Sequence, residues 1–259
     1  MSDVTPGGVT VATRPRDVAA LDAAVARLVE SQVASKMTAQ DPTLWGSDAR
    51  HEASIRLSWV DLAESSRPLI AQIEALRKKL AGEGVDRVVL AGMGGSSLAP
   101  EVITATAPVR LVTLDTTDAG QVRAAITDLD RTVLVVSSKS GGTVETDSHR
   151  RTFEKAFSDA GIDAASRIVV VTDPDSPLDE LATSAGYREV FRADPHVGGR
   201  YSALTAFGLV PAGLAGADIG NLLDEAAAVA PALAADDTAN PGLRLGALLG
   251  LAHAARAEK

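Results

Sequence analysis

Short β-branched runs alternate with amphipathic stretches in the middle of this 259-residue chain, and this alternation constrains its fold most strongly. The runs expected to form strands are residues 85–91, 109–114, 132–136 and 168–172. Helical stretches at 98–106, 118–129 and 143–160 follow the first three runs. Strands and helices alternating at this spacing form a parallel sheet. The predicted class is therefore α/β, a doubly wound parallel sheet flanked by helices on both faces, with ligands expected beyond the carboxyl ends of the strands.

Helical segments are expected before the sheet region. Residues 18–33 and 65–81 each carry apolar side chains at helical spacing, with charged residues between them. The residues before position 18 lack the basic start and apolar core of a signal peptide, so they are expected to be a frayed leader. We therefore predict an amino-terminal helical extension to the sheet.

A loop and further helices are expected after the sheet region. After Phe191 the segment ADPHVGGRYS is rich in proline and glycine, which is typical of a loop. Residues 203–259 are rich in alanine and leucine and predict two or three helices, with breaks near 213–216 and 236–242. The predicted domains are the helical extension at 1–60, the sheet domain at 61–195, and the GGRYS loop with carboxyl-terminal helices at 196–259.

Charge and composition narrow the ligands that this chain could bind. Lys and Arg total 25 against 34 Asp and Glu, so the net charge of -9 argues against nucleic acid and membrane partners. Any bound anion must be held by a local arrangement of donors. The chain has no cysteine and its four histidines are scattered, so we expect no metal site, no cofactor and a cytoplasmic location. No apolar run approaches the roughly 20 residues that a membrane span needs.

The first expected strand runs into a glycine-rich turn, GMGGSS, at residues 92–97. The following helix adds partial positive charge, and Ser96 and Ser97 add hydroxyl donors, so the turn indicates an anion site. A tight connection without a ligand is the alternative. The spacing also resembles a dinucleotide fingerprint but lacks its last glycine; Asp115, as a ribose ligand, keeps nucleotide binding open.

The third expected strand ends in a second polar loop, SSKSGGT, at residues 137–143. It offers backbone amides, four hydroxyl groups and one lysine at a single strand end; a solvated serine turn is the alternative. Because both loops follow parallel strands of one sheet, they are expected to face a common crevice and to hold a phosphate between them. No lysine follows the first glycine turn in the register of a Walker motif, so nucleoside triphosphate chemistry fits poorly.

Three segments resemble, in this order, motifs of the phosphoglucose isomerase family: GMGGSSLAP, SSKSGGTVET and VGGRYS. Residues 57–70 and 240–251 also resemble the family, so the similarity covers most of the chain from about Trp59 onward. The resemblance implies a sheet of the sugar isomerase (SIS) type. It also implies glucose-6-phosphate isomerase activity, the interconversion of glucose 6-phosphate and fructose 6-phosphate in glycolysis and gluconeogenesis, with this chain as the phosphosugar-binding amino-terminal part.

The resemblance implies a role for each matching residue. Gly95 and Ser96 would touch the phosphate end of the sugar, with Gly94 as backbone support. The second loop would bind the phosphate through Ser138, Lys139, Ser140 and Thr143. Ser140 stands where the family usually has threonine, which keeps the hydroxyl. Gly141 and Gly142 stand where phenylalanine and threonine are more usual, which predicts a more pliable loop.

The GGRYS motif would supply the catalytic residue of this chain. By the resemblance, Gly199 lies next to the substrate and Arg200 stabilises the charge that develops on the enediolate intermediate. A buried guanidinium suits that task because it does not lose its proton. A structural salt bridge is the alternative for Arg200.

Isomerisation also needs a base and groups that open the sugar ring. In the family these are a glutamate, a histidine and a lysine in the second half and carboxyl tail, and this sequence ends before the segment expected to carry the glutamate. His253 and Glu258 match no motif and are expected on a helix surface. The chain alone is therefore expected to be inactive without a carboxyl half. The alternatives are a stand-alone, non-catalytic phosphosugar-binding or regulatory module, and a divergent isomerase completed by a neighbouring subunit.

The carboxyl-terminal helices predict association with another polypeptide. In the family such helices pack against a second lobe, so their apolar side chains are expected to lack cover here. These side chains are Leu209, Val210, Leu214, Leu222, Leu223, Leu243, Leu245, Leu248, Leu249 and Leu251. We expect a homodimer or association with a carboxyl-half polypeptide.

Overall fold

The computed structural model describes residues 2–4, 8–13 and 17–254, and these group into two compact units. The sheet unit consists of residues 64–223, and the helical unit consists of the described residues up to 63 and from 224. The GGRYS loop and helix α10 (Ala206–Ala215) therefore belong to the sheet unit, beyond the boundary at 195 expected from the sequence. The reason is that α10 packs into the core of the sheet.

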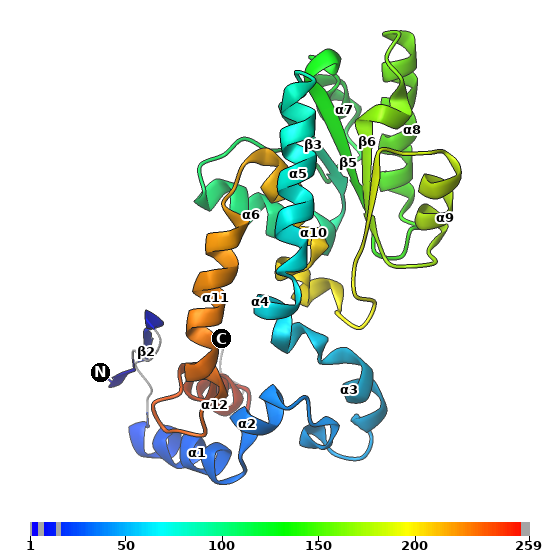
Figure 1. Cartoon of the computed structure of the whole chain (residues 1–259). Coiled ribbons are helices and arrows are strands. Elements are labelled where there is room, and N and C mark those ends of the chain that lie inside the picture. The colour runs from blue at the N-terminus through cyan, green and yellow to red at the C-terminus, as the bar shows by residue number, and fades with distance from the viewer. Residues whose placement is uncertain (1, 5–7, 14–16, 255–259) are drawn as a thin grey trace. The chain divides into compact units, whose positions relative to one another are not determined.

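Five parallel strands form the sheet, in the order β4-β3-β5-β6-β7. Figure 1 shows β3, β5 and β6 side by side. Their bounds are β3 Arg87–Gly92, β4 Val112–Leu114, β5 Thr132–Ser137, β6 Ile168–Thr172 and β7 Glu189–Arg192. The expected parallel α/β sheet is confirmed. Strand β7 was not expected, because it lies at an edge of the sheet and buries only Phe191 fully, so its sequence EVFR lacks an apolar run.

Helices cover both faces of the sheet. Helices α5 (Pro68–Gly82) and α10 pack on one face, while α7 (Ala119–Ala125), α8 (Val144–Asp159) and α9 (Pro177–Ser184) pack on the other. Helix α6 (Leu98–Thr106), which connects β3 to β4, packs against α10. The observed bounds of α6 and α8 lie within one residue of the bounds expected from the sequence.

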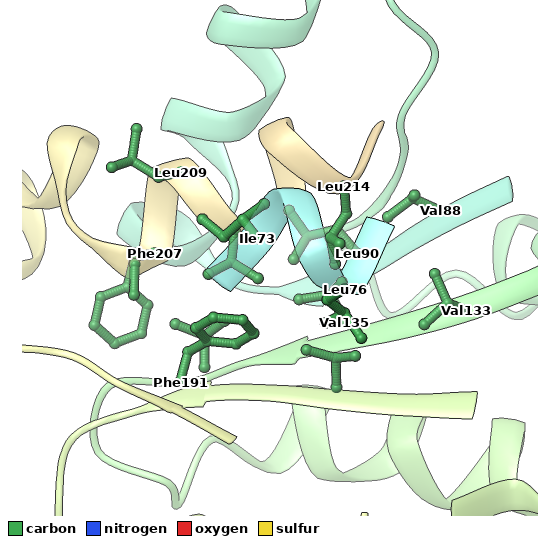
Figure 2. Close-up of a cluster of buried hydrophobic side chains, with 14 of the residues drawn as sticks. Ile73, Leu76, Val88, Leu90, Val133, Val135, Phe191, Phe207, Leu209 and Leu214 are labelled. Atoms are coloured by element: carbon green, nitrogen blue, oxygen red, sulfur yellow. The ribbon is translucent and has the colours of Figure 1, made fainter. Parts of the chain in front are cut away.

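The strands bury both of their faces, which explains their continuous apolar runs. Successive side chains of a strand point to opposite faces, so Leu90 joins the cluster under α5 and α10 whereas Val89 joins the cluster under α8. Figure 2 shows the first cluster, in which Ile73 of α5 and Phe207 of α10 lie against side chains of β3, β5 and β7. This two-sided core fixes the strand ends that carry the polar loops.

The helical unit contains α1 (Val18–Glu30), α2 (Val33–Thr38), α3 (Arg50–Arg56) and α12 (Pro241–Ala254). Its other elements are the antiparallel pair β1 (Ser2–Val4) and β2 (Val11–Thr13) and the 3₁₀ turns η2 (Pro42–Trp45) and η3 (Ser58–Asp61). The boundary between the units falls within α4 (Leu62–Ser65) and within α11 (Ile219–Ala234). Within the described residues, no helix combines the length and the apolar character of a membrane span.

The amino-terminal region differs from its expected form in two places. The single helix expected at 18–33 is two helices, because Gln32 adopts a left-handed conformation with φ of 57° between α1 and α2. The expected frayed leader falls partly on residues 1, 5–7 and 14–16, which lie outside the described residues, and its remainder includes the β1–β2 pair.

The carboxyl-terminal helices bury much of the apolar surface that was expected to lack cover. The expected breaks are confirmed between α10, α11 and α12. The expectation of missing cover is wrong for Leu209, Val210, Leu214, Leu223 and Leu243, which are buried within the chain, while Leu245 and Leu249 are exposed. His253 lies exposed on α12, as expected, and Glu258 lies outside the described residues.

Candidate functional site

The two polar loops lie side by side at the carboxyl ends of β3 and β5. The strands are neighbours, and Gly92 at the end of β3 pairs with Ser137 at the end of β5. A Cβ atom on Gly92 would lie 2.8 Å from the Ser96 carbonyl oxygen and 3.2 Å from the Ser137 carbonyl oxygen. The GMGGSS turn, which includes the 3₁₀ turn η4 (Gly94–Ser96), therefore folds back directly beside the second loop.

The GGRYS loop contacts the first of these loops, the GMGGSS turn, through its backbone. It forms the 3₁₀ turn η7 (Gly199–Leu204), and a Cβ atom on Gly95 would lie 2.5 Å from the Gly199 carbonyl oxygen. The Ser202 hydroxyl donates a hydrogen bond to the same carbonyl oxygen at 2.7 Å. The fold thus brings together the three segments that resemble family motifs, although about 40 to 60 residues separate each segment from the next along the chain.

The second loop is held by its own hydroxyl groups and by close packing. The Ser138 and Thr143 hydroxyls are hydrogen-bonded to each other at 3.0 Å, and the Ser140 hydroxyl accepts from the Gly142 amide at 3.3 Å. Gly141 has a φ of 69°, and a Cβ atom there would lie 2.8 Å from the Leu178 nitrogen. Gly141 is therefore a closely packed position, whereas Gly142 faces open space, and the expected pliability of the loop stays a prediction.

Lys139 ties three neighbouring strand ends together. Its ammonium group donates to both carboxylate oxygens of Asp173, at 2.9 and 2.7 Å, and to the Pro195 carbonyl oxygen at 3.3 Å. Asp173 follows β6 and Pro195 follows β7, so the lysine that was expected to bind phosphate also has a carboxylate partner. Sequence reasoning missed Asp173, although its position directly after an expected strand places it at the same edge of the sheet.

The two helices that follow the polar loops have no side-chain cap. Ser97 and Thr143 occupy the N-cap positions of α6 and α8, but the Ser97 hydroxyl donates to the Gly94 carbonyl oxygen and the Thr143 hydroxyl bonds Ser138. The neighbouring helices α7 and α9 are capped by Asp118 and Ser176. Uncapped amide groups and the helix dipole make an amino terminus attractive to an anion. Both uncapped termini lie at the carboxyl edge of the sheet.

Arg200 and Asp115, two further residues singled out from the sequence, both have exposed side chains. Arg200, expected as a buried guanidinium, is exposed on η7, and within the described residues no ion pair to it is present, so the structure does not show the alternative salt bridge. Its exposure follows from the short, surface-lying turn that carries it. Asp115 is exposed after the edge strand β4.

Two cavities lie outside the three loops. One borders the second loop, and the other lies within the helical unit. A cavity of about 590 Å³ lies between α7 and α8 and is lined by Val144, Glu145 and His149. A larger groove of about 840 Å³ lies within the helical unit and is lined mostly by apolar side chains of α1, α2, α11 and α12, with Arg27 as its charged residue. An apolar lining with one cation is poorly suited to a sugar phosphate.

Among the described residues, no group of three or more His, Asp or Glu side chains is arranged to hold a metal ion.

The model of the phosphoglucose isomerase family matches residues 60–250, which include all three loops. The chain belongs to the phosphoglucose isomerase family. The glucose-6-phosphate isomerase of Thermosynechococcus vestitus is 37% identical over 180 residues, covering 63% of this chain and 34% of that protein. The probable glucose-6-phosphate isomerase of Natronomonas pharaonis is 33% identical over 202 residues, covering 77% of this chain and 47% of that protein. The chain thus spans between about a third and a half of the length of these relatives.

Two solved structures share the fold of this chain. A hypothetical protein from Thermus thermophilus superposes with a TM-score of 0.75 at 27% identity, covering 96% of this chain and 57% of that one. A glucose-6-phosphate isomerase from Chlamydia trachomatis superposes with a TM-score of 0.71 at 24% identity, covering 97% of this chain and 54% of that one. At this identity the similarity is one of fold. The chain therefore shares the phosphoglucose isomerase fold over nearly its whole length.

Proposed function

We propose that the sheet unit binds the phosphate group of a sugar phosphate at the carboxyl ends of β3 and β5. The observation that carries this proposal is the pair of uncapped helix amino termini, α6 and α8, beside two loops rich in hydroxyl groups. A phosphate dianion there would accept from backbone amides and hydroxyls and would be favoured by both helix dipoles. The proposed donors are Gly95, Ser96, Ser138, Lys139, Ser140 and Thr143.

The family membership supports a more specific proposal for the reaction. We propose that this chain is the phosphosugar-binding part of a cytoplasmic glucose-6-phosphate isomerase, and that a carboxyl-half polypeptide supplies the base and the ring-opening groups. Arg200 would then stabilise the negative charge of the enediolate. Its exposed position on η7 allows the guanidinium to reach a substrate that lies over the Gly95 turn.

Calorimetry with fructose 6-phosphate tests the binding step. We expect saturable heat with fructose 6-phosphate at near-millimolar concentrations and no heat with fructose, because the phosphate supplies the attraction. Thr143→Val should weaken binding, since it removes a hydroxyl beside the α8 amino terminus. Thr152→Val is the matched control, because Thr152 lies later on the same helix and its hydroxyl donates only to the Ser148 carbonyl oxygen. A folded protein that gives no heat with fructose 6-phosphate contradicts the proposal.

Mixing with a separately produced carboxyl half tests the catalytic step. We expect no isomerisation by this chain alone and measurable turnover after mixing. If this chain binds fructose 6-phosphate but the mixture shows no turnover, the result favours the stand-alone binding module, which is one of the two alternatives left open by the sequence. Sedimentation of the chain with and without the carboxyl half would show whether the exposed side chains Leu245 and Leu249 support self-association or this pairing.

A further inference from the structure

All three hydrogen-bond donors of the Lys139 ammonium group have acceptors within the protein. A lysine ammonium carries three N–H donors. In this structure they are directed to the two carboxylate oxygens of Asp173, at 2.9 and 2.7 Å, and to the Pro195 carbonyl oxygen, at 3.3 Å. A phosphate that is to bind Lys139 must therefore displace one of these acceptors.

The backbone fixes Asp173 opposite Lys139. The Asp173 amide donates to the Lys139 carbonyl oxygen at 3.3 Å, and the Ser138 amide donates to the Val171 carbonyl oxygen at 3.0 Å. The Thr172 hydroxyl adds a buried hydrogen bond to the Ser138 carbonyl oxygen at 2.7 Å. These bonds continue the β5–β6 pairing past the strand ends, so the two loops hold the carboxylate and the ammonium together.

The ion pair lies in a partly buried place, where charge matters more than on an open surface. The Lys139 side chain is 26% exposed and the Asp173 side chain is 19% exposed. Screening by water is weaker there than at a fully solvated pair. The carboxylate therefore both cancels the positive charge of Lys139 and repels a second anion brought to the same position.

We propose that Asp173 is an internal competitor of the substrate phosphate for Lys139, and that it thereby sets the affinity of the site. This inference rests on the proposed function of the loops as a phosphosugar site. Binding would exchange one anionic partner of the ammonium for another, and the carboxylate left behind would oppose the phosphate dianion. Asp173 acts on the ligand through Lys139 and through its own charge; it takes no part in proton transfer.

Charge-changing variants at Asp173 test this proposal with fructose 6-phosphate as the probe. Asp173→Asn keeps the shape and one acceptor for Lys139 but removes the negative charge, so we expect binding about tenfold tighter. Asp173→Glu keeps the charge and should stay within about threefold of the unsubstituted protein. A purely structural role predicts the reverse order, in which the isosteric Asn is neutral and the longer Glu is harmful.

Asp175→Asn is the matched control. Asp175 lies two residues later in the same loop, is exposed and carries the same charge, and asparagine tolerates its left-handed φ of 58°. We expect its affinity to stay within about twofold, because a solvated carboxylate is screened. Thermal unfolding of each variant checks that the protein is folded, and Asp173→Ser, with the same expected tightening, replaces the Asn variant if that variant does not fold.

The outcomes separate failure of the inference from failure of the proposed function. If the unsubstituted protein binds fructose 6-phosphate and folded Asp173→Asn binds no more tightly, Asp173 positions Lys139 and the inference is overturned. Equal tightening by Asp175→Asn would also overturn it, since net charge alone would explain the effect. If neither the unsubstituted protein nor Asp173→Asn binds the sugar phosphate, the proposed function fails, and the inference falls with it.

Discussion

Gly95 lies so close to Gly199 that a methyl group on Gly95 would sit 2.5 Å from the Gly199 carbonyl oxygen. The relationship is one-sided, because a Cβ atom on Gly199 would meet no atom within 4 Å. This contact joins the GMGGSS turn to the GGRYS loop, and Ser202 holds the loop in place by donating to the same carbonyl oxygen. The site therefore requires glycine at position 95, where a larger residue would not fit, but not at position 199.

Alanine substitution of these two glycines should have unequal effects. Gly95→Ala forces η4 and η7 apart, so we expect a loss of about 1–3 kcal/mol of unfolding free energy and a marked loss of fructose 6-phosphate affinity. Gly199→Ala should cost less than about 0.5 kcal/mol, since its methyl group enters open space. Urea unfolding and calorimetry measure both effects. Equal stability of the two variants would show that the backbones separate without cost.

Lys139→Ala should weaken binding of fructose 6-phosphate by about 1.5–3 kcal/mol, the range for a hydrogen bond to a charged group. Asp173 then stays near the phosphate without its partner, which adds repulsion. Lys155→Ala is the control, because Lys155 pairs with Asp159 on the exposed face of α8. A sharp fall in melting temperature with unchanged affinity would assign Lys139 a structural role.

Arg200→Ala should separate turnover from binding. We expect stability within about 0.5 kcal/mol and an affinity within about twofold, because the Arg200 side chain is exposed. Turnover of the enzyme completed by a carboxyl half should fall about 100-fold or more, the usual loss when one group that stabilises an oxyanion is removed. Equal loss of binding and turnover would place Arg200 at the phosphate instead.

Arg192→Ala provides a contrast to Arg200→Ala. Arg192 pairs with the buried carboxylate of Asp179 at 2.8 Å, and its guanidinium lowers the pKa of Asp179. Its removal should lower the unfolding free energy by about 1–2 kcal/mol, because it leaves a buried carboxylate without its main partner. Chemical unfolding of the two arginine variants in parallel would show the difference.

Tyr187 should make the protein less stable at high pH. Burial, followed by the hydrogen bond to Glu154, raises the pKa of Tyr187 to about 12. The unfolded chain ionises near a pKa of about 10, so the stabilisation is fully present below that pH and is lost as the pH rises towards 12. Urea unfolding at pH 8 and at pH 11 should therefore show a smaller unfolding free energy at the higher pH.

Tyr187→Phe should reduce this alkaline loss. At pH 8 it should cost about 1–2 kcal/mol, because Arg150 loses the hydroxyl that accepts its hydrogen bond at 2.8 Å. Tyr201→Phe, at an exposed side chain, should keep the alkaline loss of the unsubstituted protein. An unchanged pH dependence in Tyr187→Phe would show that other groups cause it.

The strand and helix pattern of the sheet unit was predictable because both faces of each inner strand are buried. Thr132–Ser137 and Ile168–Thr172 are buried throughout, which demands the continuous apolar runs seen in the sequence. Glu189–Arg192 escaped prediction, because an edge strand needs few apolar residues. The break at Gln32 escaped as well, since its left-handed backbone has no clear sequence signal.

The sequence by itself determined the α/β class, four of the five strands of the parallel sheet and the positions of the polar loops at strand ends, because apolar periodicity and glycine turns are local properties. Only the tertiary structure decided which groups meet at those ends. The pairing of β5 with β6 sets Asp173 against Lys139, and the packing of α10 brings Gly199 onto Gly95. These contacts join residues far apart in the chain, and their partners are chosen by strand order and core packing, which no local pattern contains.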